Sequence, residues 1–150
     1  MKNNRLIYKS IAYPETLEKG VITDLMSQSV SNNKAHSIYG LLLLSGDRFL
    51  QILEGPPKFI NQLYKNIIID ERHHDVELLL YEDIGEPFFA DWNMRLIELD
   101  QVSIPVYKML LKKYPHEKGK LVFPKNKLLL YSLLQDALYF SNVTGEKTNT

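Results

Sequence analysis

The chain has 150 residues, no cysteine, and 18 acidic side chains that balance 18 basic ones. A balanced charge gives no overall attraction for nucleic acid or anionic membrane, and without cysteine no disulfide framework can form. No segment reaches the roughly 20 apolar residues of a spanning helix, and residues 1–5 lack the apolar core of a signal peptide. We therefore expect a soluble, cytoplasmic protein without a nucleic-acid or membrane partner.

Apolar periodicity divides the chain into short strands and amphipathic helices. In chain order we predict a strand at 6–12, a helix at 16–26 that the polar stretch 27–34 ends, strands at 37–44 and 48–53 joined by a turn at 45–47, a helix around Phe59, Leu63 and Ile67, strands at 76–83 and 93–99, and helices at 103–114 and 125–139. The order β-α-β-β-α-β-β is typical of an α+β, ferredoxin-like sheet with two helices on one face.

Both faces of the predicted sheet are apolar. Alternation along the strands places Leu6, Tyr8, Ser10, Phe49, Gln51, Leu53, Trp92, Met94 and Leu96 on one face, and Ile7, Leu50, Ile52 and Ile97 on the other. The two helices between the strands cover one face, and we expect the two C-terminal helices to cover the second. The alternative is a free amphipathic helix pair that binds a membrane or a partner. The chain then divides into a sheet domain (1–100), a packed helical extension (101–142) and a flexible tail (143–150).

One residue stands out in the predicted core. Gln51 lies in the middle of an apolar strand, and a buried amide without partners costs about 1–3 kcal/mol. It indicates either a local hydrogen-bond network or a polar ligand. Taken singly, Tyr8, Trp92 and Met94 are ordinary core residues. Because all four share the helix-facing side, they could together enclose one aromatic, hydrogen-bonding ligand.

Other chemistries find little support in the sequence. His73 and His74 are adjacent, so they point to opposite faces of a strand, and no second ligand motif at metal-binding spacing accompanies them. No phosphate-binding loop and no nucleophile motif is present, which argues against a hydrolase or nucleotidase. A sheet that stacks RNA bases would need an open face with a basic stripe, and we expect this face to be covered.

Six segments, in order, resemble the BLUF domain, the blue-light sensor using flavin, between residues 5 and 99. They are Arg5-Leu6-Ile7-Tyr8-Lys9-Ser10, Asn32-Asn33, Ile38-Tyr39-Gly40-Leu41-Leu42, Phe49-Leu50-Gln51-Ile52-Leu53-Glu54-Gly55, Asp70-Glu71-Arg72-His73-His74 and Phe89-Ala90-Asp91-Trp92-Asn93-Met94. The resemblance implies a non-covalent flavin between the two helices, FAD by family habit, with FMN as the alternative. Tyr8 matches the tyrosine that donates an electron and a proton to the excited flavin. Gln51 matches the glutamine that switches between tyrosine and flavin.

The remaining site residues also follow from the resemblance. Asn33 matches the asparagine that holds the carbonyl edge of the ring, and Asn32 its neighbour. Met94 and Trp92 match the two residues that sense the rearrangement of the glutamine. Arg72 is the candidate for the flavin phosphate, because a guanidinium pairs bidentately with phosphate.

The resemblance implies a photoreceptor that is not itself an enzyme. We expect no fused effector, so the output passes to a separate signalling protein or to a change in self-association of a homo-oligomer. The C-terminal helices are the expected output surface. The alternative is a non-photoactive ferredoxin-like interaction module, which would be colourless. A small flavin-dependent redox enzyme would need an open substrate site, for which no residues are set aside.

Overall fold

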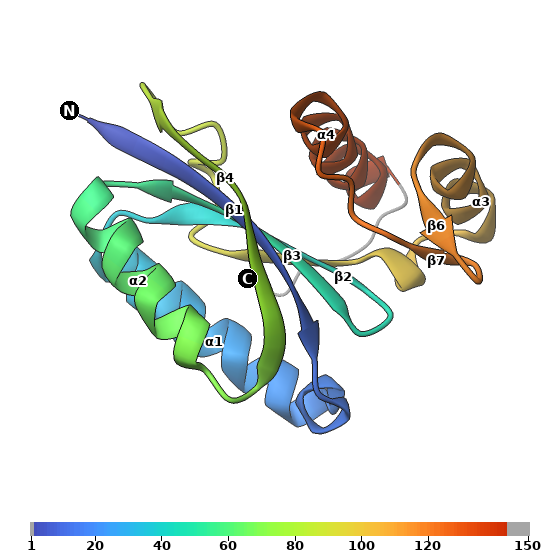
Figure 1. Cartoon of the computed structure of the whole chain (residues 1–150), viewed down its shortest axis with the longest axis horizontal. Coiled ribbons are helices and arrows are strands. Elements are labelled where there is room, and N and C mark those ends of the chain that lie inside the picture. Colours follow the sequence, from blue (N-terminus) through green and yellow to red (C-terminus); the bar gives the residue numbers. More distant parts are fainter. Residues whose placement is uncertain (1, 144–150) are drawn as a thin grey trace.

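A five-stranded sheet with strand order β4-β1-β3-β2-β5 forms the centre of the computed structural model, which describes residues 2–143 (Figure 1). The strands are β1 (Asn3–Ala12), β2 (Tyr39–Ser45), β3 (Arg48–Gly55), β4 (His73–Ile84) and β5 (Arg95–Glu98). Neighbouring strands are antiparallel, except that β5 runs parallel to β2. The predicted hairpin turn lies at Gly46, whose positive φ of 61° favours glycine.

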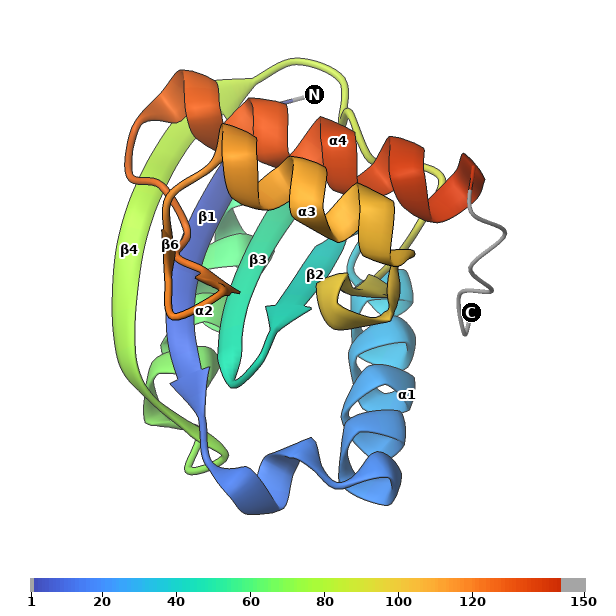
Figure 2. The same ribbon diagram turned by 90° about the vertical axis from the view of Figure 1, so that its right-hand side faces the viewer.

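Helices cover both faces of the sheet. Helices α1 (Lys19–Ala35) and α2 (Pro57–Ile69) lie on one face, and α3 (Ile104–Lys113) and α4 (Lys127–Val143) lie on the other (Figures 1 and 2). Short 3-10 helices occupy Pro14–Leu17 and Leu99–Gln101, and a two-stranded hairpin, β6 (His116–Glu117) and β7 (Lys120–Leu121), joins α3 to α4. The predicted α+β, ferredoxin-like fold with two extra C-terminal helices is confirmed.

The sheet separates two apolar cores. One core packs Leu6, Leu53 and other residues of the sheet against α1 and α2, and the second packs Ile7, Leu50 and their neighbours against α3 and α4. The C-terminal helices therefore cover the second face, as predicted, and the alternative of a free helix pair is wrong. The division at residue 100 stays a prediction. The tail expected at 143–150 lies outside the described residues, apart from Val143.

The structure moves several of the predicted boundaries and adds the two 3-10 helices and the β6–β7 hairpin. The polar stretch 27–34 does not end the first helix, because Val30 packs into the core and Asn33 is buried on the same face as Ile22 and Met26. The last strand begins only at Arg95, two residues later than predicted. The β6–β7 hairpin was not predicted, because strands of two residues are too short to show a period. Among residues 2–143, no helix has the length and apolar character needed to span a membrane.

Candidate functional site

A cavity of about 320 Å³ lies between α1, α2 and the sheet. This volume falls within the range of about 300–1,000 Å³ that is typical of small-molecule sites. Its polar lining includes Tyr8, Asn32, Asn33, Gln51, Asp70, Arg72 and His73, and its apolar lining includes Leu25, Leu42, Phe49, Leu63 and Ile67. Apolar walls with a few amide and charged groups suit a flat, heteroaromatic ligand.

Gln51 is the centre of a buried hydrogen-bond chain. The antiparallel register of β1 and β3 places Tyr8 directly opposite Gln51. The Tyr8 hydroxyl donates to Gln51 Oε1, and Gln51 Nε2 donates to Met94 Sδ at 3.4 Å. Tyr8, Gln51 and Met94 are only 4%, 7% and 1% exposed. The amide that looked out of place in the sequence thus has partners on both ends, and it also lines the cavity.

The environment of Tyr8 keeps its hydroxyl protonated. Burial raises the pKa of Tyr8 far above the ordinary value, and the nearby Tyr64 and Asp70 raise this pKa further. The ring of Tyr8 lies 5.8 Å from that of Tyr64 and 6.2 Å from that of His73, measured between centroids. A protonated hydroxyl in this place is a hydrogen-bond donor that can also give up its proton when an electron leaves the ring.

The two asparagines lie in the last turns of α1. Asn33 is buried, and its Nδ2 donates to the backbone oxygen of Asn93 at 2.7 Å. Asn32 lies beside it and donates from Nδ2 to Asn33 Oδ1 at 3.4 Å. Both side chains line the cavity. Asn33 therefore connects the cavity wall to the segment that precedes β5.

Arg72 lines the cavity but is already paired. Its Nε and Nη2 donate to the carboxylate of Asp70 at distances of 2.6–3.2 Å. The hydrogen bonds from Arg72 hold the pKa of Asp70 below the usual range, although burial acts in the opposite direction. A phosphate at Arg72 would have to share the guanidinium with Asp70. Asp70 was missed from the sequence, because a carboxylate is not expected beside an anionic group.

His73 is another lining residue that the sequence did not place in the cofactor site. Its Nδ1 lies 2.7 Å from Ser10 Oγ, and its Nε2 lies 2.7 Å from the backbone oxygen of Ile67 at the end of α2. Both ring nitrogens of His73 are therefore hydrogen-bonded within the protein. His73 thereby ties β4 and β1 to α2 at one side of the cavity.

Trp92 lies on the other side of the sheet. It packs against the core beneath α3 and α4, and the guanidinium of Arg95 lies 5.2 Å from the centre of its ring. The expectation that Trp92 shares a face with Met94 is wrong. Strand alternation does not extend to Trp92, because its N–H bonds the oxygen of Phe89 at 3.1 Å in a turn before β5. Of Trp92 and Met94, Met94 is the residue that is hydrogen-bonded to Gln51.

Comparison with known proteins gives one family. The model of the family described as "BLUF: Sensors of blue-light using FAD" matches residues 4–95. The blue light- and temperature-regulated antirepressor BluF of Escherichia coli (strain K12) is 33% identical over 115 residues, which are 73% of this chain and 28% of that protein. The chain thus spans less than a third of this curated relative.

Solved structures agree in fold. The structure of BlsA in its photo-activated state is similar with a TM-score of 0.67 and 25% identity, over 99% of this chain and 98% of that one. A bacterial light-regulated adenylyl cyclase is 35% identical with a TM-score of 0.68, over 73% of this chain and 33% of that one. From the family match, the ordered motifs and the cavity together, the chain belongs to the BLUF family, the sensors of blue light using FAD.

Proposed function

We propose that the Tyr8–Gln51–Met94 hydrogen-bond chain is the light-operated switch of this blue-light sensor. The observation that carries the proposal is the orientation of the Gln51 amide, which accepts from Tyr8 and donates to Met94 while it lines the cavity. When bound, FAD supplies the absorption of blue light and an excited ring that takes up an electron. The family description names FAD, and we propose Arg72 as the residue for its phosphates.

The residues of the cavity fit such a ring. The amides of Asn32, Asn33 and Gln51 each offer a donor and an acceptor, which matches the alternating donors and acceptors of a flavin edge. Leu25 and Ile67, from α1 and α2, supply apolar walls on the two sides of the cavity. All these side chains come from the elements that the family resemblance predicts to hold the cofactor.

The switch follows from the two unlike ends of an amide. In light, Tyr8 would give one electron and its hydroxyl proton to the bound ring, and both would return to Tyr8 in the dark, so no net product would form. While the hydroxyl is deprotonated, Gln51 loses the donor to its oxygen, and rotation or tautomerisation exchanges its donor and acceptor ends. A stronger hydrogen bond from the rearranged Gln51 amide to a carbonyl of bound FAD would shift its absorption slightly to the red. The contact with Met94 changes in the same step, which requires only a few kcal/mol of differential interaction.

Spectroscopy of variants tests the switch. We expect Tyr8→Phe and Gln51→Leu to retain FAD and to lose the reversible red shift after blue light. Tyr139→Phe is the matched control, because Tyr139 lies exposed on α4 and should leave the shift unchanged. Normal photocycling in either pocket variant would refute the mechanism. Protein that stays colourless after reconstitution would instead favour the non-photoactive interaction module.

We further propose that the output passes through the C-terminal helices to a separate partner, and that the chain is not itself an enzyme. Ile104 on α3 is 72% exposed, and Lys108 and Lys112 follow it at four-residue spacing on the same helix face. Neither lysine forms an ion pair with another residue of the described range 2–143. A partly apolar and basic helix face suits an acidic protein segment. One relative is an antirepressor and another a light-regulated cyclase, so effectors differ within the family.

Self-association is the other route for the output. Sedimentation of the FAD-loaded chain in the dark and under blue light would measure it, with Ile104→Ser as the variant of the exposed face. A mass that changes with light and loses this change in Ile104→Ser would indicate an oligomer built on α3. A mass that does not change with light would favour output through a separate partner protein. The cytoplasmic location and the homo-oligomeric state stay predictions.

A further inference from the structure

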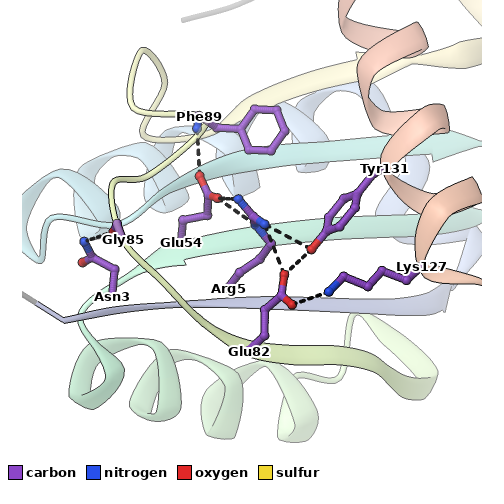
Figure 3. Close-up of polar contacts among 8 residues, drawn as sticks. All are labelled: Asn3, Arg5, Glu54, Glu82, Gly85, Phe89, Lys127 and Tyr131. Atoms are coloured by element: carbon purple, nitrogen blue, oxygen red, sulfur yellow. Dashed lines mark hydrogen bonds and ion pairs between the residues drawn. The ribbon is translucent and has the colours of Figure 1, made fainter.

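A row of alternating charges crosses the sheet on the face that α4 covers (Figure 3). The register pairs Arg5 of β1 with Glu54 of β3 on one side and with Glu82 of β4 on the other. Arg5 Nε and Nη2 donate to Glu54 Oε2 at 2.8 and 2.6 Å, and Nη1 donates to Glu82 Oε1 at 3.2 Å. Three adjacent strands are thereby joined by one guanidinium.

One end of the row contacts α4. The hydroxyl of Tyr131 accepts from Arg5 Nη1 at 3.1 Å and donates to Glu82, and Lys127 Nζ donates to Glu82 Oε2 at 2.7 Å (Figure 3). Arg5 also lies 5.2 Å from the centre of the Tyr131 ring. Lys127 and Tyr131 are four residues apart, so they share one face of the first turns of α4.

The other end of the row contacts the segment that precedes β5. The second carboxylate oxygen of Glu54 accepts from the backbone N–H of Phe89 at 2.8 Å (Figure 3). Asn3 of β1 donates to the oxygen of Gly85 at 2.9 Å, which fixes the start of the same loop. The side chain of Glu54 is 0% exposed. The buried carboxylate therefore holds a loop backbone on one oxygen and Arg5 on the other.

The same segment reaches the cavity a few residues later. The backbone oxygen of Asn93 accepts from Asn33 of the cavity wall, and the Asn93 side chain donates to the oxygen of Ile38 at 3.0 Å. Met94 accepts from the switch residue Gln51. Residues 89–94 thus contact the switch on one face of the sheet and Glu54 on the other.

Stability is a weak explanation for this row. A buried ion pair is often no more stabilising than apolar side chains of the same size, and Leu130, Tyr131 and Leu134 of α4 belong to the apolar core on this face. In a medium of low dielectric, the hydrogen bonds of one network polarise one another, so the loss of one donor changes the strength of the bonds that remain. A shift of the Phe89 N–H away from Glu54 would therefore change how Arg5 is shared between Glu54, Glu82 and Tyr131.

We propose that Glu54 is a positioning residue for the segment 89–94, and that the Glu54–Arg5–Glu82 row passes a displacement of this segment to Tyr131 and Lys127 on α4. The inference rests on the proposed function, because Gln51 must rearrange in light for the segment to move. It adds a defined route between the cavity and the C-terminal helix on the opposite face of the sheet.

Glu54→Gln interrupts the row at one point. Its amide oxygen can still accept from the Phe89 N–H, but its NH₂ group cannot pair with Arg5. The matched control is Lys113→Gln, which removes an ion pair between α3 and Asp136 of α4 that lies outside the row (2.8 Å). Two quantities are measured on the full chain with FAD: the light-induced red shift, and amide hydrogen exchange over α4 in the dark and in blue light.

We expect light to change the exchange rates of residues 127–134 at least about twofold in the unmodified protein and in Lys113→Gln. Glu54→Gln should keep the red shift and lose more than half of this exchange difference. An undiminished exchange difference in Glu54→Gln would overturn the inference, as would an α4 that does not respond to light in the unmodified protein. Absence of the red shift in the unmodified protein would instead refute the proposed function.

A second variant covers the case in which Glu54→Gln does not fold. Tyr131→Phe removes one hydroxyl and leaves the ring in place, so only its bonds with Arg5 and Glu82 are lost. It should likewise retain the red shift and lose more than half of the exchange difference. An unchanged exchange difference in Tyr131→Phe would overturn the inference.

Discussion

Replacing Met94 by leucine tests which residue before β5 contacts the switch glutamine. Met94 is 1% exposed, and leucine has nearly the same volume, so the free energy of unfolding should fall by less than about 1.5 kcal/mol. The substitution removes the sulfur that accepts from Gln51 Nε2 at 3.4 Å. A hydrogen bond of this kind contributes about 1 kcal/mol, and re-forming it in the recovery step changes the rate up to about fivefold. We therefore expect slower dark recovery with an intact red shift.

The assay is the recovery of the visible spectrum after a pulse of blue light, followed with time. Trp92→Phe is the matched control, because Trp92 packs in the core beneath α3 and α4, whereas the hydrogen-bond partners of Gln51 are Tyr8 and Met94. It should recover within about twofold of the unmodified rate, since the hydrogen bonds of the switch are untouched. Slow recovery in Trp92→Phe together with normal recovery in Met94→Leu would refute the arrangement described above.

Three further predictions concern the scaffold and the cavity. A Cβ on Gly40 would lie 1.9 Å from the backbone oxygen of Ile52, so Gly40→Ala should lower the free energy of unfolding in urea by about 3 kcal/mol or more, whereas Gly20→Ala, with open space in α1, should raise it by about 0.5–1 kcal/mol. Burial raises the pKa of Tyr8, so its hydroxyl stays neutral in the folded protein, and the stability that depends on the neutral form is lost only as the pH rises above the usual tyrosine pKa. The red shift should therefore stay constant from about pH 6 to about pH 10. A loss of the red shift with a midpoint near pH 10 would contradict this. If Arg72 binds phosphate, Arg72→Gln should weaken FAD about tenfold in a fluorescence titration and leave riboflavin unchanged; equal weakening of both would contradict the role.

Most of the fold could be predicted because its strands alternate clearly between two apolar faces. The phase of Tyr8 and Gln51 was predicted correctly, since β1 and β3 pair in a regular register at this point, although the register of β1 with β4 shifts between Ile7 and Tyr8. The phase of Trp92 was not, because it lies in a turn where alternation has no meaning. The length of α1 was also missed, since Asn33 is a polar residue on a buried helix face and breaks the apolar pattern.

The cavity was predicted only in part, for a physical reason. The amides of Asn32, Asn33 and Gln51 line it. The place of Gln51 follows from the strand pattern, whereas the two asparagines were expected there only because the family resemblance implied them. The contributions of Asp70 and His73 depend on how the end of α2 meets β4, and no periodicity carries that information. A charge pair at such a junction, here Asp70 with Arg72, can be recognised only from the tertiary structure.

Strand β3 carries Gln51 on the cavity face of the sheet and Glu54 on the face that α4 covers, so the proposed switch and the proposed output surface lie on opposite sides of one strand. Gln51 and Glu54 are three residues apart, so their side chains point to opposite faces of the same strand. The backbone of a paired strand cannot move far without breaking two ladders at once, and β3 is paired with both β1 and β2. A change at Gln51 is therefore hard to pass straight through the sheet to Glu54. The proposed route instead uses a segment that contacts both faces, since residues 89–94 do so through Met94 on one side and Phe89 on the other.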